Sequence, residues 1–102
     1  EHLYAALIAY LLAGVFMGVL YWSLDQVWPD SIVVNGPGAS GPFLPMEGVY
    51  FSFITLATVG YGDMVPGNDV VRNLAIMEAI AGQFYLAVMI ARLMSLYMRE
   101  AR

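Results

Sequence analysis

Two long apolar runs in this chain are separated by a polar middle section. The first run, residues 3–24, carries no charged side chain over about 22 positions. At a rise of about 1.5 Å per residue, such a run is long enough to cross a hydrocarbon layer of about 30 Å. The second run covers residues 69–98 and is also mostly apolar. The pattern predicts two membrane-spanning helices at these positions.

The middle section combines a polar connector with one short apolar segment. Residues 25–45 are rich in glycine and proline, which do not continue a helix. Residues 46–57 are apolar but too few to span a membrane, so they predict a re-entrant helix. Pro45 suits the first turn of that helix, and Glu47 complements its positive dipole end. Asn68 is the predicted N-cap of the second long helix.

The fold predicted from this pattern is an all-α membrane protein with a single domain. Its elements are an outer helix, a connector or turret, a short re-entrant helix, a glycine-containing loop and an inner helix, at residues 3–24, 25–45, 46–57, 58–62 and 69–98. Aromatic residues suited to the membrane interface lie at both ends of the outer helix: Tyr4, Tyr21 and Trp22. Gly14 and Gly18 predict close approach of another helix, most simply the inner helix.

The amino-acid composition limits the classes of function that this chain can have. The chain has 102 residues, of which 61% are hydrophobic and 12% charged, and its mean hydropathy is +0.71. These values favour a membrane-embedded chain with lipid around it. A net charge of -4 argues against binding nucleic acid, whose phosphates require a basic surface. Because cysteine is absent, disulfides and thiolate metal sites are excluded. No cofactor is expected.

The charges also predict an orientation. Arginines lie toward the C-terminal end, whereas acidic residues lie on the connector side, at Asp25, Asp30, Glu47, Asp63 and Asp69. The positive-inside preference then places both termini in the cytoplasm of a multi-pass plasma-membrane protein. Arg92, Arg99 and Arg102 support this orientation, and Arg72 is the one contrary charge. The chain begins at Glu1 without an initiator methionine and reads as a piece of a longer protein.

The segment with the most specific chemistry follows the short helix and reads Thr58-Val59-Gly60-Tyr61-Gly62-Asp63. Glycine adopts positive φ at little cost, so successive carbonyl oxygens can turn toward one line. Rings of such oxygens from four copies can replace the water around a potassium ion. The hydroxyl of Thr58 can add another oxygen, while Val59 and Tyr61 pack behind the loop. The alternative, an ordinary glycine-rich turn, is disfavoured by the length of the motif.

With this segment between two spans, the chain resembles the two-helix pore domain of tetrameric potassium channels of the prokaryotic type. The resemblance implies a homotetramer in a prokaryotic cell membrane, with residues 46–57 as the pore helix, residues 58–62 as the selectivity filter and K⁺ as the permeant ion. The physics also favours oligomerisation, because non-helical backbone at membrane depth must be surrounded by protein or water.

The resemblance assigns further roles on the inner helix. Gly82 stands where the family carries a hinge glycine, although close packing against the pore helix explains a glycine there equally well. Four residues at helical spacing would line the cavity and inner gate: Leu86, Ile90, Met94 and Met98. The alternative for this stripe is helix-bundle core.

Four more positions near the filter can be interpreted. Tyr50 stands where the family often has a pore-helix tryptophan, so we expect its phenol to bond Asp63. Ile54 replaces a buried glutamate that some members carry behind the filter, and Ala57 replaces a common threonine. Glu78 is the sole acidic residue well inside the second span and should face protein. Its expected partners are hydroxyl groups, at Ser52, Thr55 or Thr58.

Other functions are less well supported by the sequence. His2 is the only histidine, and no nucleophile motif accompanies it, so no enzyme is predicted. Potassium transporters of similar architecture generally carry four imperfect filter repeats in one chain, and a nonselective channel would have an altered filter. The remaining alternative is the pore module of a larger voltage- or ligand-gated channel, with regulatory or sensor domains outside this fragment.

Overall fold

The computed structural model describes residues 2–35 and 41–100, which form an elongated unit measuring 58 × 24 × 21 Å. Residues 36–40 of the predicted connector, and Arg102, lie outside the described residues. The chain is mostly helical, and its elements follow in the order α1 (His2–Val27), β1 (Ile32–Val34), α2 (Pro45–Leu56), β2 (Met64–Pro66) and α3 (Asp69–Glu100).

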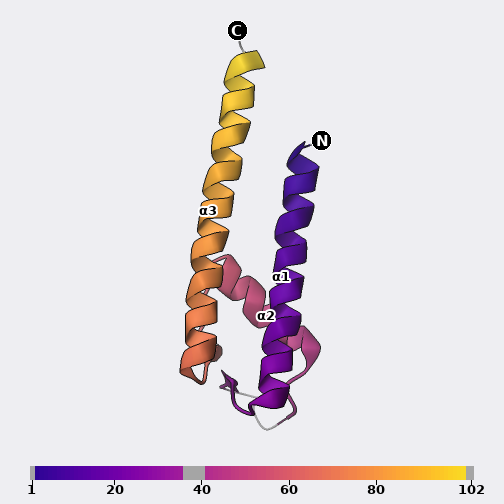
Figure 1. Cartoon of the computed structure of the whole chain (residues 1–102), viewed down its shortest axis with the longest axis vertical. Coiled ribbons are helices and arrows are strands. Elements are labelled where there is room, and N and C mark those ends of the chain that lie inside the picture. Colours follow the sequence, from indigo (N-terminus) through magenta and orange to yellow (C-terminus); the bar gives the residue numbers. More distant parts are fainter. Residues whose placement is uncertain (1, 36–40, 101–102) are drawn as a thin grey trace.

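Helices α1 and α3 run in opposite directions, so the described chain starts and ends at the same end of the molecule (Figure 1). Their 26 and 32 residues correspond to lengths of about 39 and 48 Å. Both are long and apolar enough to cross a membrane, which agrees with the two predicted spans. Each continues slightly beyond its predicted end, α1 to Val27 and α3 to Glu100.

Helix α2 crosses between α1 and α3 in the half of the molecule away from the termini (Figure 1). Its buried side chains include Phe51, whose ring meets that of Tyr21 edge to face at a centroid distance of 4.9 Å. Tyr21 is fully buried, so the prediction that it lies at the membrane interface is wrong. The phenol is instead drawn into the core because α2 covers this part of α1.

The glycines of α1 pack against α2, and the prediction that they face the inner helix is wrong. A Cβ added at Gly18 would lie 2.4 Å from the Cα of Val49, and one at Gly48 would lie 2.4 Å from the carbonyl oxygen of Gly18. At Gly14 an added Cβ would meet the ring of Phe53 at 2.4 Å. These contacts follow from the position of α2 between the long helices, and they let its backbone approach α1 closely.

A short sheet joins the connector to the chain after the glycine loop, which the all-α prediction omitted. Strands β1 and β2 are antiparallel, and Val33 pairs with Val65. The ladder continues at both ends, where Asn35 N–H donates to the Asp63 carbonyl and Gly67 N–H donates to the Ser31 carbonyl, both at 2.7 Å. The β-branched run at residues 32–34 is the local cause. The sheet fixes the backbone next to Asp63.

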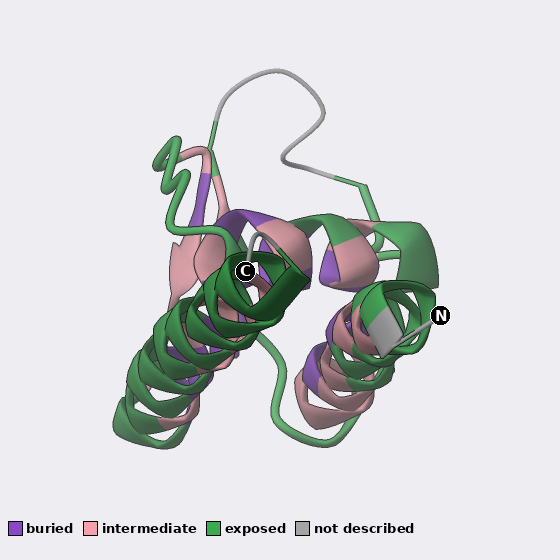
Figure 2. Ribbon diagram, turned by 90° about the horizontal axis from the view of Figure 1, so that it is seen from above, coloured by how far each residue is buried: buried purple, intermediate pink, exposed green. Residues whose placement is uncertain are grey.

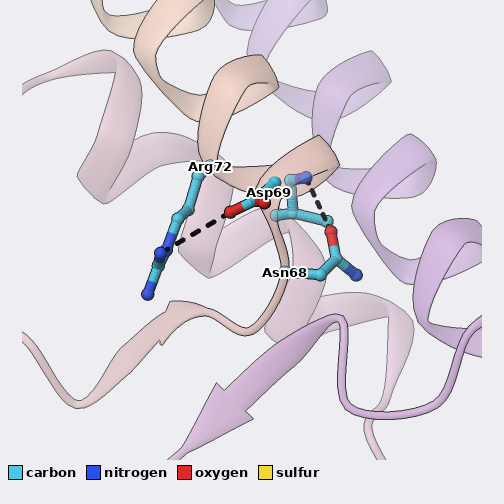
Figure 3. Close-up of polar contacts among 4 residues, drawn as sticks. Asn68, Asp69 and Arg72 are labelled. Carbon is cyan, nitrogen blue, oxygen red and sulfur yellow. Dashed lines mark hydrogen bonds and ion pairs between the residues drawn. The ribbon is translucent and has the colours of Figure 1, made fainter.

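The start of α2 has the predicted proline and glutamate in its first turn, and the start of α3 has the predicted cap. Pro45 occupies the first turn of α2, and Glu47 Oε1 accepts the Leu44 N–H at 2.8 Å. At the start of α3, Asn68 Oδ1 accepts the N–H of Val71 at 2.9 Å, as Figure 3 shows.

Arg72 has a local partner close to this cap. Its guanidinium lies 3.7 Å from the carboxylate of Asp69, one turn earlier, and both side chains are mostly exposed (Figure 3). Such an exposed pair contributes little to stability. It nevertheless neutralises the one arginine at the connector end of the molecule.

The outward sides of the long helices are exposed in the single chain (Figure 2). The buried core lies where α1, α2, α3 and the sheet meet, at Tyr21, Ile32, Phe51, Ile54, Met64, Val71 and Ala75. Large apolar side chains remain exposed elsewhere on both helices, among them Phe16 and Phe84. Apolar surface of this extent indicates contact with lipid or with other protein chains.

Candidate functional site

The glycine loop directly after α2 has an alternating backbone conformation. Thr58, Gly60 and Gly62 have φ angles of 56°, 57° and 89°, whereas Val59 and Tyr61 between them do not have positive φ. Glycine adopts such angles freely, but for a β-branched threonine a positive φ is a strained outlier. Strain of this kind persists only where the surrounding structure enforces it, and it is concentrated at functional sites.

The start of this loop is tied to the last turn of α2. The carbonyl oxygen of Ile54 accepts N–H bonds from Val59 at 2.8 Å and from Gly60 at 3.1 Å, and Thr58 N–H donates to the Thr55 carbonyl at 3.1 Å. These donors satisfy carbonyl groups that a helix end leaves without partners. The loop therefore begins at the negative dipole end of α2, where a cation is favoured.

The side chains of the loop have little contact with the rest of the single chain. Val59 is 48% exposed and Tyr61 is 73% exposed. An added Cβ at Gly60 or Gly62 would meet nothing within 4 Å. The open surroundings leave room for further chains on both sides of the loop.

Gln83 contacts the loop and was not among the residues that we predicted. Its Nε2 donates to Thr58 Oγ1 at 3.4 Å, and the same hydroxyl donates to the Ala57 carbonyl at 2.7 Å. Gln83 and Thr58 also line a cavity of about 440 Å³ with Ala79, Ile80, Phe84 and Ala87. The sequence feature that could have indicated this role is the single amide side chain among apolar residues directly after Gly82.

The expected bond between Tyr50 and Asp63 is present. Tyr50 Oη donates to Asp63 Oδ2 at 2.8 Å, while Asp63 Oδ1 accepts the N–H of Met64 at 3.0 Å. The hydrogen bond to Asp63, helped by partial desolvation and by the negative charge nearby, raises the pKa of Tyr50 above its usual 10.0. The bond joins α2 to the outer end of the loop.

Replacing Tyr50 with phenylalanine should make the outer end of the loop less stable. Because the pKa of Tyr50 is raised, its bond to Asp63 is fully present below pH 10.0 and is lost only as the pH rises through the higher value. If the loop is the filter of a pore, as the sequence predicts, Tyr50→Phe should shorten the openings in single-channel recordings at neutral pH. Tyr97→Phe, at an exposed tyrosine of α3, is the control. Open times equal to wild type in Tyr50→Phe would contradict the proposed support.

Glu78 lies in a buried polar cluster that joins all three helices. Its Oε1 accepts from Tyr21 Oη at 2.8 Å, and its Oε2 accepts from Ser52 Oγ at 2.6 Å. Ser52 Oγ also lies 2.7 Å from the carbonyl oxygen of Gly14. All three side chains are buried, with Glu78 only 5% exposed. The cluster places the carboxyl group of Glu78 against α2, the helix that precedes the loop.

The partners of Glu78 were predicted only in part. The bond to Ser52 was expected and is present. Neither Thr55 nor Thr58 bonds Glu78 within the described residues. The second partner, Tyr21, was missed because its position near the end of an apolar run indicated an interfacial anchor. Whether the cluster supports the loop functionally stays a prediction.

Gly82 faces the end of α2. A Cβ added there would lie 2.7 Å from Leu56 Cδ1 and 2.8 Å from the Leu56 carbonyl oxygen. Close packing therefore requires a glycine at this position, whether or not the helix also bends there. Helix α3 is continuous from Asp69 to Glu100.

The predicted cavity stripe remains on an uncovered side of α3. Ile90, Met94 and Met98 are between 55% and 60% exposed, and Leu86 is half-buried. The helix-bundle core is formed by other residues of α3, at Val71 and Ala75. The stripe is thus not core within the single chain.

Comparisons with known proteins agree with this arrangement. Residues 3–99 match the model of a family described as ion channel. The chain is 32% identical over 92 residues to two-pore potassium channel 3 of Arabidopsis thaliana, which covers 90% of this chain and 18% of that protein. It is 44% identical over 52 residues to potassium channel subfamily K member 16 of Mus musculus, covering 44% of this chain and 18% of that protein.

Proposed function

The chain belongs to the ion-channel family, in which its curated relatives are potassium channels, and we propose that four copies form a potassium-selective pore. Potassium would pass through it passively, with residues 58–62 as the selectivity filter. Ion conduction is not enzyme chemistry, and K⁺ is the permeant ligand.

The observation that carries this proposal is the alternation of positive φ at Thr58, Gly60 and Gly62. It releases this loop from regular secondary structure and lets successive carbonyl groups turn toward one side. Rings of carbonyl oxygens can replace the hydration shell of K⁺. The end of α2 supports the same assignment, because its dipole favours a cation at the start of the loop.

Assembly would cover the parts of the site that one chain leaves open. The exposed side chains of Val59 and Tyr61 need a packing partner if they lie behind a filter at membrane depth. A neighbouring copy can provide it, and four copies close a ring of carbonyl groups. The open space beside Gly60 and Gly62 would then be the ion path.

The cavity and gate are proposed for the uncovered stripe of α3. With the filter on the common axis, the exposed faces of Ile90, Met94 and Met98 would meet those of the other copies below it. Gly82 lies one turn before this stripe and would allow α3 to bend. Gln83 would present its amide just beneath Thr58.

The proposed location is the plasma membrane, with both termini in the cytoplasm. The start of α1 and the end of α3 lie at the same end of the molecule (Figure 1). Arg92 and Arg99 lie at that end, as the positive-inside preference requires. Arg72 at the other end is paired with Asp69. A prokaryotic cell membrane remains our prediction.

The proposal is tested by the reversal potential of the reconstituted protein with K⁺ on one side and Na⁺ on the other. We expect a strong preference for K⁺ and a clear loss of it in Tyr61→Asp, because that change removes aromatic packing and places four acidic groups near the ring. Tyr97→Phe should keep the preference. Equal permeability in the wild type, or an unchanged preference in Tyr61→Asp, would overturn the assignment of the filter.

The second candidate is the pore module of a larger voltage- or ligand-gated channel. The chain spans only 18% of the length of the two relatives described above. Regulatory or sensor domains outside this segment would then control the gate. A potassium transporter subunit is a weaker alternative, which steady unitary current steps in the same recordings would exclude.

A further inference from the structure

One cavity lies between α1 and α3, near the start of α1 and the end of α3. Its volume is about 600 Å³, and it falls within the range of roughly 300–1,000 Å³ typical of ligand pockets. The wall on α1 is formed by Leu3 and by two small residues, Ala5 and Ala6. The small side chains explain why the space between the helices is not filled here.

The inner end of this cavity is closed by aromatic contacts. The phenol of Tyr85 donates to the carbonyl oxygen of Ala6, and its ring stacks on that of Tyr10 at a centroid distance of 5.7 Å. On the other side of this contact no third helix lies between α1 and α3, because α2 is in the other half of the molecule (Figure 1). The cavity is therefore a groove between Tyr85 and the ends of the two helices that lie away from α2.

The wall on α3 combines apolar and basic side chains. Val88 and Leu96 are apolar, while Arg92, Ser95 and Arg99 add polar groups to the same wall. Arg92 and Arg99 are two helical turns apart, about 10 Å, and point in nearly the same direction around the axis. Within residues 2–35 and 41–100 the one ion pair is that of Arg72, so these two guanidinium groups have no carboxylate partner there.

This wall faces away from the predicted pore stripe. On a helix with 3.6 residues per turn, Arg92 lies about 160° around the axis from Ile90. If Ile90 and Met94 face the ion path, Arg92 and Arg99 face the outer helix and the lipid. The groove then opens to the membrane, with its basic end at the level of the cytoplasmic headgroups.

We propose that this groove binds an anionic phospholipid of the cytoplasmic leaflet. Its phosphate would be held by Arg92 and Arg99, and an acyl chain would lie along Val88 and Leu96. Guanidinium groups bind phosphate oxygens through paired, charge-assisted hydrogen bonds. Basic pockets between membrane helices on the cytoplasmic side are suited to such headgroups. The inference rests on the proposed membrane orientation but not on conduction.

The test is lipid binding to the delipidated, detergent-solubilised protein, measured by native mass spectrometry. The probes are phosphatidylglycerol and phosphatidylcholine with identical acyl chains. We expect at least roughly tenfold tighter binding of phosphatidylglycerol. The double variant Arg92→Gln with Arg99→Gln should abolish that preference, whereas Arg72→Gln should keep it. Inorganic phosphate at the same concentration should not displace the lipid, because it lacks the acyl chains.

A second variant tests the groove itself. Ala6→Trp would fill the space and should weaken the binding of both lipids while leaving the far-ultraviolet circular dichroism unchanged. Equal binding of the two lipids by wild type would overturn the proposal. So would a preference that survives in the double arginine variant, or an Ala6→Trp chain that binds lipid normally. Loss of K⁺ selectivity with intact phosphatidylglycerol binding would count against the pore and not against this site.

Discussion

Replacing Glu78 with alanine is expected to lower the free energy of unfolding by about 2–4 kcal/mol. The change removes the acceptor of Tyr21 Oη, which is fully buried, and leaves a cavity among three helices. A buried hydroxyl without a partner keeps its full desolvation cost. Thermal unfolding in detergent measures the loss of stability, and single-channel recording measures whether the filter closes more often.

Glutamine at position 78 is the matched control. The Ser52 hydroxyl has one hydrogen but two oxygen neighbours, Glu78 Oε2 at 2.6 Å and the Gly14 carbonyl at 2.7 Å. A glutamine amide can donate to Ser52, which frees the hydroxyl hydrogen for Gly14, while its oxygen accepts from Tyr21. We therefore expect Glu78→Gln to unfold within about 1 kcal/mol of wild type.

A double-variant cycle separates the hydrogen bond from the loss of volume. Tyr21→Phe should destabilise the wild type, because it removes one donor to Glu78. In the Glu78→Ala background the same change should be neutral or stabilising, because it removes the phenol that has lost its acceptor. Equal effects of Tyr21→Phe in both backgrounds, or wild-type stability of Glu78→Ala, would show that the cluster contributes nothing.

The sequence predicts well those features that depend on local properties of the chain. The two spans follow from apolar length, the start of α2 from Pro45, and the cap of α3 from Asn68. The glycine loop was recognised because its chemistry requires particular residue types at consecutive positions. Such features are specified within a few residues, so no knowledge of the tertiary packing is needed.

The features that were missed depend on how the helices cross. Tyr21 and Glu78 are 57 residues apart, and their contact follows from the packing of α1 against α3 beside α2. The Gly14 and Gly18 pair indicated a close approach but not which helix would make it. The strand at residues 32–34 is too short for a clear alternating pattern, and its partner β2 is equally short.

Replacing Gly82 with alanine should destabilise the contact between α3 and the end of α2. The new Cβ would lie 2.8 Å from the Leu56 carbonyl oxygen, a backbone atom that cannot rotate away. Overpacking of this kind costs about 1–3 kcal/mol, and the better helix propensity of alanine offsets up to about 1 kcal/mol.

A bending role for Gly82 predicts a different result from a packing role. We expect Gly82→Ala to lower the open probability if α3 must bend there, with unitary conductance and selectivity unchanged. Ala81 is exposed, so the double variant Ala81→Gly with Gly82→Ala restores a flexible glycine without relieving the contact with Leu56. Recovery of the open probability in that double variant supports the hinge. The double variant differs from Gly82→Ala only in having a flexible glycine at position 81. A lowered unfolding temperature in both variants, with gating equal to wild type, would instead assign Gly82 to packing alone.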